Sequence, residues 1–350
     1  MKLRILSLLT LVALLVSFAV ACKPVEDTPA GTTEAPTETP TGTVEPPLTP
    51  TDVRVFTMNG TTGFGMAKLM EDAANGVFKT EKYTFEVKTD FAKDVLPALI
   101  NGDADIAAIP TNGASVAYNK TQGGVKVLAV NTLGCLYVIG KDAVNSLEEL
   151  AAKEKVQAPA QNPTFILKYL YQKNGLSADN IANDYTAPAD LAAAVASGKV
   201  DYAVLPEPMI TVAKNQAAKK GTTVVSSLDL TAEWDRLDGM QGKLVQGCVV
   251  VRTAFLEAHP EAVANFLTAY EASVNYLLSH ADDTAKLIVR HGIFAQEAVA
   301  KAAIPKCNIA FVAGDTMKAA MDAYLKVLFG IAPASIGGKV PDDAFYYTAK

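Results

Sequence analysis

From residue 53 onward, hydrophobic positions recur with two alternating periods, one typical of strands and one typical of helices. The segment 53–58, VRVFTM, alternates apolar and polar residues as a half-buried strand does. The next predicted helix ends near Gly76 and carries one apolar stripe, formed by Met66, Leu69, Met70 and Ala73. Further elements are predicted as strands at 83–88, 105–109 and 125–131 and a helix at 92–101. Strands that alternate with helices indicate parallel sheets with covered faces, and hence α/β architecture.

One unit of this pattern occurs twice, 96 residues apart. Residues 100–110 read INGDADIAAIP and residues 196–206 read ASGKVDYAVLP. Each copy contains an apolar helix, a glycine stop, a short apolar strand and a proline that ends the strand. The matched positions are Gly102 with Gly198, Asp105 with Asp201, Ala107 with Ala203, and Pro110 with Pro206. The duplication predicts two α/β halves that face one another across a cleft.

The second half repeats the order of the first. A capping-box start at 146–149, SLEE, precedes a strand at 155–160, a loop at 161–164 and a helix that ends at Asn174. After the second copy of the repeat, Glu207 and Pro208 precede a helix that ends near Ala218 and a strand, TTVVS.

Two long apolar runs break this symmetry, at 131–140 and 244–252, and each contains Gly-Cys in its middle. We interpret them as strands that cross between two lobes, with Gly134 and Gly247 permitting bending. Helices predicted from Pro260 to about Gly330 would pack on the first lobe. The expected domain ranges are therefore 53–133 plus 248–350 for lobe 1, and 134–247 for lobe 2.

The N-terminus is set apart from the folded region. Lys2 and Arg4 precede an uncharged stretch at 5–21, which on its own would also fit an uncleaved membrane anchor. Small residues directly before Cys22 instead resemble the bacterial lipoprotein signal, although Ala19 stands where leucine is usual. We therefore expect a signal peptide at 1–21, lipidation of Cys22, and an extracytoplasmic protein anchored to the cell membrane by its lipid.

Residues 22–52 are expected to form a disordered linker. The part after Cys22 holds seven Pro and nine Thr and no aromatic residue, so it cannot bury enough apolar surface to offset its ordering entropy. Its reach would be up to ~90 Å in a polyproline-like form. The formal net charge of −6 becomes −8 once the signal is removed, which argues against a nucleic-acid partner.

Three cysteines remain in the folded part, Cys135, Cys248 and Cys307, and an odd number leaves at least one thiol unpaired. Cys135 and Cys248 would either form a disulfide across the hinge or pack as buried thiols, and we favour packing. The spacing of the cysteines does not match zinc ligands, and the three histidines lie in amphipathic helical surroundings. We assign no metal and no cofactor.

In the order of these features, the chain resembles the type II periplasmic-binding-protein fold, and more narrowly the nitrate/sulfonate/taurine-type receptors of ABC importers. That group also includes pyrimidine-precursor and riboflavin receptors. The resemblance covers about residues 53–345 and is carried by FTMNGTTGFGMAKLM, the repeat, the segment 205–208 (LPEP), the two crossovers and the lipoprotein start. It implies a monomeric receptor with two lobes on a two-strand hinge. The lobes would close over one small solute and deliver it to a membrane permease and its ATPase.

In open α/β sheets, ligands bind beyond the carboxyl ends of the strands, where loops and helix N-termini converge. Asn, Thr and Gly at helix starts are also common in caps and turns, so the prediction of ligand contact depends on their symmetric placement in the two halves. The candidate ligand-binding residues, including two on the crossovers, are Asn59, Thr61, Thr62, Gly63, Pro110, Thr111, Asn112, Thr132, Asn162, Pro163, Thr164, Glu207 and Gln246.

Glu207 would either be stabilised by its helix N-terminus or accept hydrogen bonds from an amine or amide of the ligand. The four loops that hold most of the candidate residues, at 59–63, 110–112, 162–164 and 207, contain no Arg or Lys, which favours a neutral or nitrogen-containing heterocycle over sulfonate or nitrate. Phe64, Tyr118 and Trp234 would stack on such a ring or, more commonly, belong to the core.

Two other functions stay open at this point. An enzyme on the same fold, of the pyrimidine-synthesis or menaquinone-pathway type, would need a placed nucleophile or histidine, and the cleft loops offer no Cys/His or Ser/His pairing. A ligand-sensing lipoprotein of a signalling system would use the same cleft with a different partner.

Overall fold

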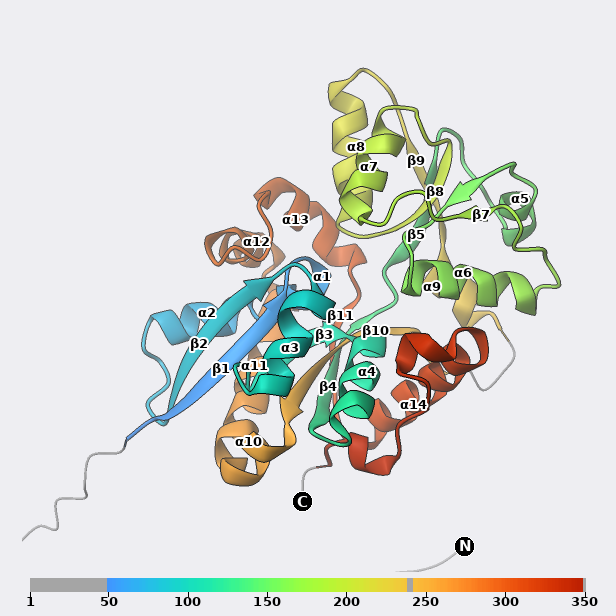
Figure 1. The fold of residues 1–350 in the computed structure, drawn as a ribbon. Helices are drawn as coiled ribbons and strands as arrows, with labels where there is room; N and C mark the ends of the chain where they lie inside the picture. Colours follow the sequence, from blue (N-terminus) through green and yellow to red (C-terminus); the bar gives the residue numbers. More distant parts are fainter. Residues whose placement is uncertain (1–48, 238–241, 349–350) are drawn as a thin grey trace, which may run out of the picture. The chain divides into compact units, whose positions relative to one another are not determined.

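The computed structural model describes residues 49–237 and 242–348 (Figure 1). The predicted signal peptide, Cys22 and most of the linker lie outside the described residues. The last linker positions do not: the first strand begins at Thr51, two residues before its predicted start. Among the described residues, no helix is long and apolar enough to cross a membrane.

A six-stranded sheet has the order β11-β4-β10-β3-β1-β2. Strand β1 pairs in parallel with β2 and β3, whereas β10 is antiparallel to both of its neighbours, β3 and β4. Its strands are β1 (Thr51–Met58), β2 (Glu81–Lys88), β3 (Ile106–Pro110), β4 (Val125–Leu133), β10 (Val245–Arg252) and β11 (Ile309–Val312).

The second sheet has five strands in the order β7-β6-β8-β5-β9. Strand β5 is antiparallel to β8 and β9, as β10 is to β3 and β4. The strands are β5 (Leu136–Gly140), β6 (Val156–Gln157), β7 (Ile181–Ala182), β8 (Tyr202–Pro206) and β9 (Val225–Asp229). In each sheet the strand that follows a crossing of the chain from the other sheet, β5 or β10, is antiparallel to its neighbours, and β11 is antiparallel to β4 as well. This arrangement confirms the predicted α/β fold with two lobes and two crossover strands.

Helices cover the faces of both sheets (Figure 1). Up to Lys219 they are α1 (Thr61–Phe64), α2 (Ala67–Ala74), the π-helical turn η1 (Phe91–Val95), α3 (Leu96–Asn101), α4 (Thr111–Thr121), α5 (Leu147–Ala151), α6 (Asn162–Lys173), α7 (Pro188–Ala196) and α8 (Met209–Lys219). The others are α9 (Leu230–Asp235), α10 (Thr253–Ala258), α11 (Pro260–Ser279), α12 (Ala281–Arg290), α13 (Glu297–Ala303) and α14 (Gly314–Ile331), with short 3₁₀ turns η2 (Ile304–Lys306), η3 (Pro333–Ile336) and η4 (Asp343–Phe345).

The duplicated sequence unit is a duplicated structural unit. Gly102 and Gly198 both follow a helix with positive φ, 86° and 71°, a conformation that glycine adopts without a steric penalty. Pro110 and Pro206 are the last residues of β3 and β8, each directly followed by the segment that enters the next helix. The repeat therefore marks equivalent strand ends in the two sheets.

The C-terminal helices do not all pack on the first sheet. Residues of α11 and α12 share one apolar core with β1, β3 and β10. Helix α14 joins a different core, which includes strands of both sheets, and contacts α4 and α6. There the Tyr324 ring lies 5.8 Å from the ring of Trp234, which also packs 5.0 Å from Tyr169. The predicted helical region also contains a short strand, β11.

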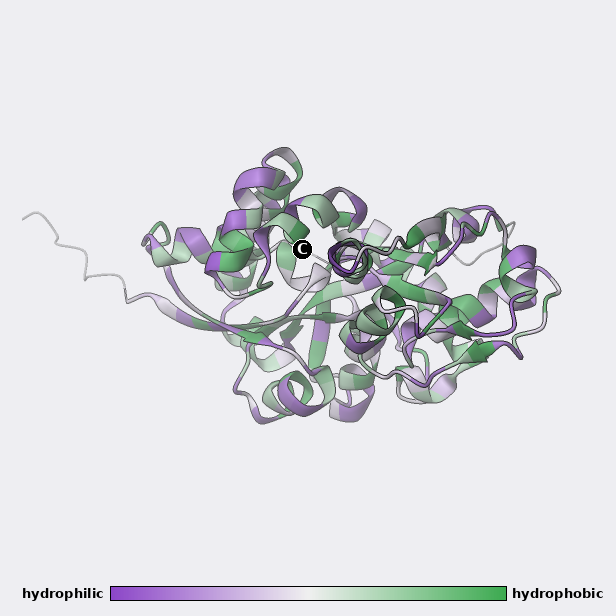
Figure 2. Cartoon of the chain, turned by 90° about the horizontal axis from the view of Figure 1, so that it is seen from above, coloured by the Kyte–Doolittle hydropathy of each residue, from purple (hydrophilic) through white to green (hydrophobic). Residues whose placement is uncertain are grey.

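The distribution of hydropathy follows from this arrangement. In Figure 2 the inner strands are mostly hydrophobic and the helices carry both hydrophobic and hydrophilic segments, whereas the edge strand β2, EKYTFEVK, alternates between the two. Amphipathic helices bury one stripe against a sheet and leave the other in water. Trp234, Phe64 and Tyr118 all belong to the buried core.

Candidate functional site

A cavity of about 420 Å³ lies where the loops after β1, β3 and β8 meet the start of α6. It is lined from both sheets. The predicted ligand-binding residues that line it are Asn59, Thr61, Thr62, Pro110, Thr132, Asn162, Glu207 and Gln246. Its size falls in the range usual for small-molecule sites. We call it the first cavity.

The structure does not bring every predicted residue to this cavity. Asn112 and Pro163 line a second cavity next to it. Thr111 is fully buried, because α4 begins at Thr111 and the predicted loop there is the first helical turn. Thr164 is buried as well, and its hydroxyl donates to the carbonyl of Pro159 at 2.9 Å.

Gly63 is not among the residues that line the first cavity, and it provides packing space beside them. It lies inside α1, and a Cβ atom at this position would lie 2.2 Å from the carbonyl oxygen of Met58. The glycine therefore allows α1 to start directly against the end of β1, which positions Thr61 and Thr62 at the first cavity.

Glu207 is 1 % exposed and provides the only carboxylate among the described residues that line the first cavity. The backbone N–H of Thr211 donates to Oε2 and the Thr211 hydroxyl donates to Oε1, both at 3.1 Å. Burial raises the pKa of the Glu207 carboxyl, and the Thr211 hydrogen bonds oppose this shift. No Arg or Lys is among the described residues of this lining.

A direct hydrogen bond joins the two halves of the first cavity. The Thr61 hydroxyl donates to the backbone carbonyl oxygen of Glu207 at 2.7 Å, and the Glu207 N–H donates to the carbonyl of Cys135 at 3.0 Å. Thr61 follows β1 of the first sheet, whereas Glu207 follows β8 of the second. The contact thus holds the two strand ends together.

The crossover residues stabilise each other as well as line the cavity. Oε1 of Gln246 accepts the Cys135 backbone N–H at 2.7 Å, which ties one crossover to the other. The Thr132 hydroxyl donates to Oδ1 of Asn131 at 3.0 Å, and Asn131 Nδ2 donates to the Thr62 carbonyl at 3.0 Å. Both predicted crossover residues therefore have partners within the protein.

Gly134 and Gly247 lie where side chains of neighbouring segments leave no room for a Cβ atom. A Cβ atom on Gly134 would lie 2.1 Å from Thr231 Oγ1, and one on Gly247 would lie 2.5 Å from Asn131 Oδ1. Their observed role is close packing of the two crossovers. Bending at these glycines stays a prediction.

Cys135, Cys248 and Cys307 are all buried and free. The structure thus has packed thiols and no disulfide between Cys135 and Cys248. Burial, with a smaller contribution from the Glu207 charge, raises the pKa of Cys135 to about 12, so the one cysteine that lines the first cavity is a neutral thiol at pH 7. Such a thiol is a poor nucleophile.

Within the described ranges, no group of three or more His, Cys, Asp or Glu side chains is placed to hold a metal ion. His291 Nε2 donates a hydrogen bond of 2.9 Å to the Glu71 carboxylate, which belongs to α2, and neither residue lines the first cavity.

Several lining residues were missed at the sequence level. Thr89 follows β2, and residues 187–189 lie after β7 at the start of α7. Both loops stand beyond the carboxyl ends of parallel strands, so the rule that selected the other loops could have selected these. Phe294 comes from the segment after α12, and the sequence carries no signal for its placement.

The two sheets, the antiparallel crossover strands and the cavity between the strand ends define the two-lobed fold of the periplasmic binding proteins. The chain belongs to the NMT1/THI5-like family, whose model matches residues 73–284. No curated protein matches the chain significantly.

Solved structures show the same fold. An ABC transporter protein from Parabacteroides distasonis is 23% identical, with a TM-score of 0.71 over 86% of this chain and 100% of that chain. A ligand-binding component of an ABC-type import system from Staphylococcus aureus, with zinc bound, is 12% identical, with a TM-score of 0.62 over 84% and 98%. The alkanesulfonate-binding protein SsuA from Xanthomonas axonopodis pv. citri, bound to MOPS, is 16% identical, with a TM-score of 0.62 over 86% and 99%.

Proposed function

We propose that this protein is the extracytoplasmic solute receptor of an ABC importer. It would bind one small organic solute in the first cavity, between two lobes that close on the crossovers, and deliver the solute to a membrane permease with its ATPase. The observation that carries the proposal is the first cavity itself, which is lined by strand-end loops from both sheets. The fold shared with components of ABC import systems supports it.

The lining indicates the chemistry of the solute. Glu207 is a buried carboxylate with no cationic side chain beside it in the lining, and its Thr211 hydrogen bonds leave lone pairs free. A neutral or cationic solute with N–H donors, such as a nitrogen heterocycle, satisfies that carboxylate. A sulfonate or nitrate would meet repulsion from Glu207 in its ionised form.

The same lining favours binding over catalysis. It contains no histidine among the described residues, and its thiol, Cys135, has a raised pKa. An acyl- or group-transfer site needs a nucleophile activated by a base. The lipoprotein anchor at Cys22, a monomeric state and the ranges of the two lobes remain part of the proposal.

A thermal-shift screen of heterocycles, sulfonates, vitamins and amines on residues 49–350 tests this function. A solute that binds only the folded state raises its stability by mass action, by about 2.7 kcal/mol at one hundred times its Kd. We expect a nitrogen heterocycle or amine to shift the melting temperature. Absence of any shift at millimolar solute would contradict the receptor function.

Substitutions test whether the melting-temperature shift arises from binding at Glu207. Glu207→Gln should abolish or weaken the shift, whereas Glu233→Gln should leave it unchanged, because Glu233 is a mostly buried carboxylate on α9 outside the cavity lining. A co-transcribed permease and ATPase would favour an importer over a sensor that uses the same cavity.

A further inference from the structure

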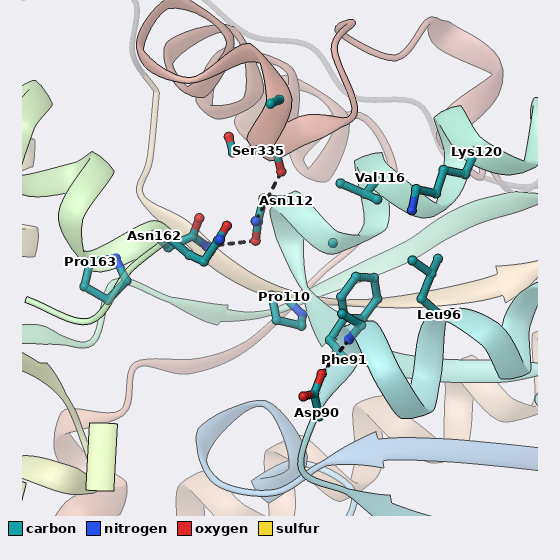
Figure 3. A pocket seen from close by; sticks show the side chains of 14 residues that line it. Asp90, Phe91, Leu96, Pro110, Asn112, Val116, Lys120, Asn162, Pro163 and Ser335 are labelled. Atoms are coloured by element: carbon teal, nitrogen blue, oxygen red, sulfur yellow. Dashed lines mark hydrogen bonds between the residues drawn. The ribbon is translucent and has the colours of Figure 1, made fainter. Parts of the chain in front are cut away.

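A second cavity of about 470 Å³ adjoins the first one (Figure 3). It is formed by η1, α3, α4 and η3 on one side and the start of α6 on the other. Its lining is mainly apolar, with the ring of Phe91 and the side chains of Leu96 and Val116 among its walls. Phe91 also packs against α4, where a Cβ atom on Gly113 would lie 2.9 Å from the ring.

The two cavities share a wall made of two residues, Pro110 and Asn162, which line both. At this wall Asn162 Nδ2 donates to Asn112 Oδ1 at 3.1 Å, and Asn112 Nδ2 donates to the Ser335 carbonyl at 3.3 Å. Figure 3 shows both bonds, with Asn112 between Asn162 and Ser335. The first bond joins α4 to α6, so one side-chain contact between the lobes separates the cavities.

Some polar side-chain atoms at this wall lack a hydrogen-bond partner. Asn162 and Ser335 are each 9 % exposed, and Asn162 Oδ1 and Ser335 Oγ have no hydrogen-bond partner within the described part of the chain. Buried polar atoms normally have a partner, and exceptions often mark functional positions. A hydrogen-bonding group of the solute that stands at this wall, between its two ends, would supply the missing contacts.

The two cavities differ in the groups that they offer. The first has a buried carboxylate, Glu207, in its lining, whereas the second combines the Phe91 ring and other hydrocarbon with the charged side chains of Asp90 and Lys120. A cleft that holds a solely polar solute would have no use for the second compartment. An apolar group placed there gains the free energy of leaving water.

We propose that the second cavity holds an apolar, ring-sized arm of the solute whose hydrogen-bond-donating head lies in the first cavity. The inference rests on the proposed function and narrows it to amphipathic solutes with two unlike ends. The Asn112–Asn162 bond stands at the point where the arm passes from one cavity to the other.

Cysteine labelling tests the apolar compartment without knowledge of the solute. The probes are benzyl methanethiosulfonate and 2-hydroxyethyl methanethiosulfonate, and the readout is the labelling rate by intact-protein mass spectrometry. Val116→Cys places a thiol in the second cavity, and Val77→Cys places one at a position that is 56 % exposed. The parent protein gives the background from its buried cysteines.

The benzyl-to-hydroxyethyl rate ratio should be at least about tenfold higher for Val116→Cys than for Val77→Cys, because burial of an aromatic ring favours the benzyl probe. Equal ratios would overturn the inference. The two tests are independent. Equal labelling ratios would not affect the proposed function, since the thermal-shift screen uses neither cysteine variant, and a screen without any shift would not change the labelling ratio. Circular dichroism and urea unfolding of both variants show whether each is folded, and Leu96→Cys, at another position of the second cavity, replaces Val116→Cys if that variant is not folded.

Discussion

The Thr61 hydroxyl, at the end of the first strand, donates a hydrogen bond of 2.7 Å to the backbone oxygen of Glu207, 146 residues later in the chain. The donor is the first residue of α1, after β1 of the first sheet, and the acceptor follows β8 of the second sheet. A residue predicted to bind ligand is thus also a contact between the lobes. The hydrogen bond therefore fixes the backbone of Glu207, whose carboxylate lines the first cavity, relative to α1.

Replacement of Thr61 by valine tests this contact. Thr61→Val keeps the shape of the side chain but leaves the Glu207 carbonyl without that donor, and we expect a loss of about 1–2 kcal/mol in the free energy of unfolding. Urea denaturation measures the change. Thr84→Val, at an exposed position of β2, is the matched control and should change stability by less than about 0.5 kcal/mol. Equal effects would show that the Thr61 bond contributes nothing.

The raised pKa of Glu207 predicts a specific pH dependence of stability. Because burial raises the folded-state pKa above the ordinary value of 4.5, the protonated carboxyl is favoured in the folded protein. The folded state therefore binds the proton more tightly than the unfolded state, and the wild type loses stability as the pH rises from 4.5 through the folded-state pKa. Glu207→Gln removes this loss, so the variant should gain stability relative to the wild type from pH 4 to pH 7.

Urea unfolding at several pH values measures that difference, with Glu233→Gln as the control. A stability difference between wild type and Glu207→Gln that stays constant across the range would contradict the raised pKa. Binding of a cationic solute should follow the opposite trend, since it requires the ionised carboxylate and strengthens as the pH rises.

Asp105 and Asp201 occupy the same position of the repeat but differ in environment. Asp105 is buried and accepts hydrogen bonds from the Arg54 guanidinium at 2.9 and 2.6 Å and from the Arg54 backbone N–H at 3.0 Å. Asp201 pairs with Lys141 at 2.7 Å, and both side chains are 56% exposed. Comparing the two residues shows how much burial of the ion pair changes its contribution to the free energy of unfolding.

Asp105→Asn should lower the free energy of unfolding by about 2 kcal/mol, less than a fully buried pair because the Arg54 side chain is 44% exposed. Asp201→Asn should change it by less than about 1 kcal/mol, as expected for an exposed ion pair. Chemical denaturation of both variants gives the comparison. Similar losses in the free energy of unfolding would contradict this expectation, because they would show that burial does not determine how much each aspartate stabilises the fold.

The repeat was predictable because its signals are local. Glycine after a helix and proline after a strand act through their own backbone conformations, so Gly102 and Pro110 could be assigned from neighbouring residues alone. The first cavity followed from the same positions, since strand ends in equivalent sheets converge on one edge. Eight of the predicted residues line it for this reason.

Other features depend on contacts that no local pattern carries. Thr111 and Thr164 were predicted as ligand contacts because a hydroxyl at a helix start suits either role, and their burial is decided by the packing of α4 and α6. The strand predicted as TTVVS lies later, at β9 (Val225–Asp229), where pairing with β5 overrides the preference of the β-branched residues. The contact of α14 with helices of the second lobe arises from tertiary packing around Trp234.

The close approach at Gly247 yields the last prediction. A Cβ atom there would meet Asn131 Oδ1 at 2.5 Å and Thr132 at 3.0 Å, so Gly247→Ala must displace one crossover strand from the other. We expect a loss of about 1–3 kcal/mol, typical of overpacking. Gly330→Ala on α14 is the matched control: a Cβ atom has open space there, and the gain should be about 0.5–1 kcal/mol because alanine favours the helix. Unfolding of both variants in urea measures these opposite signs. An unchanged stability in Gly247→Ala would mean that the crossovers separate at no cost, and that the glycine is kept for bending rather than for packing.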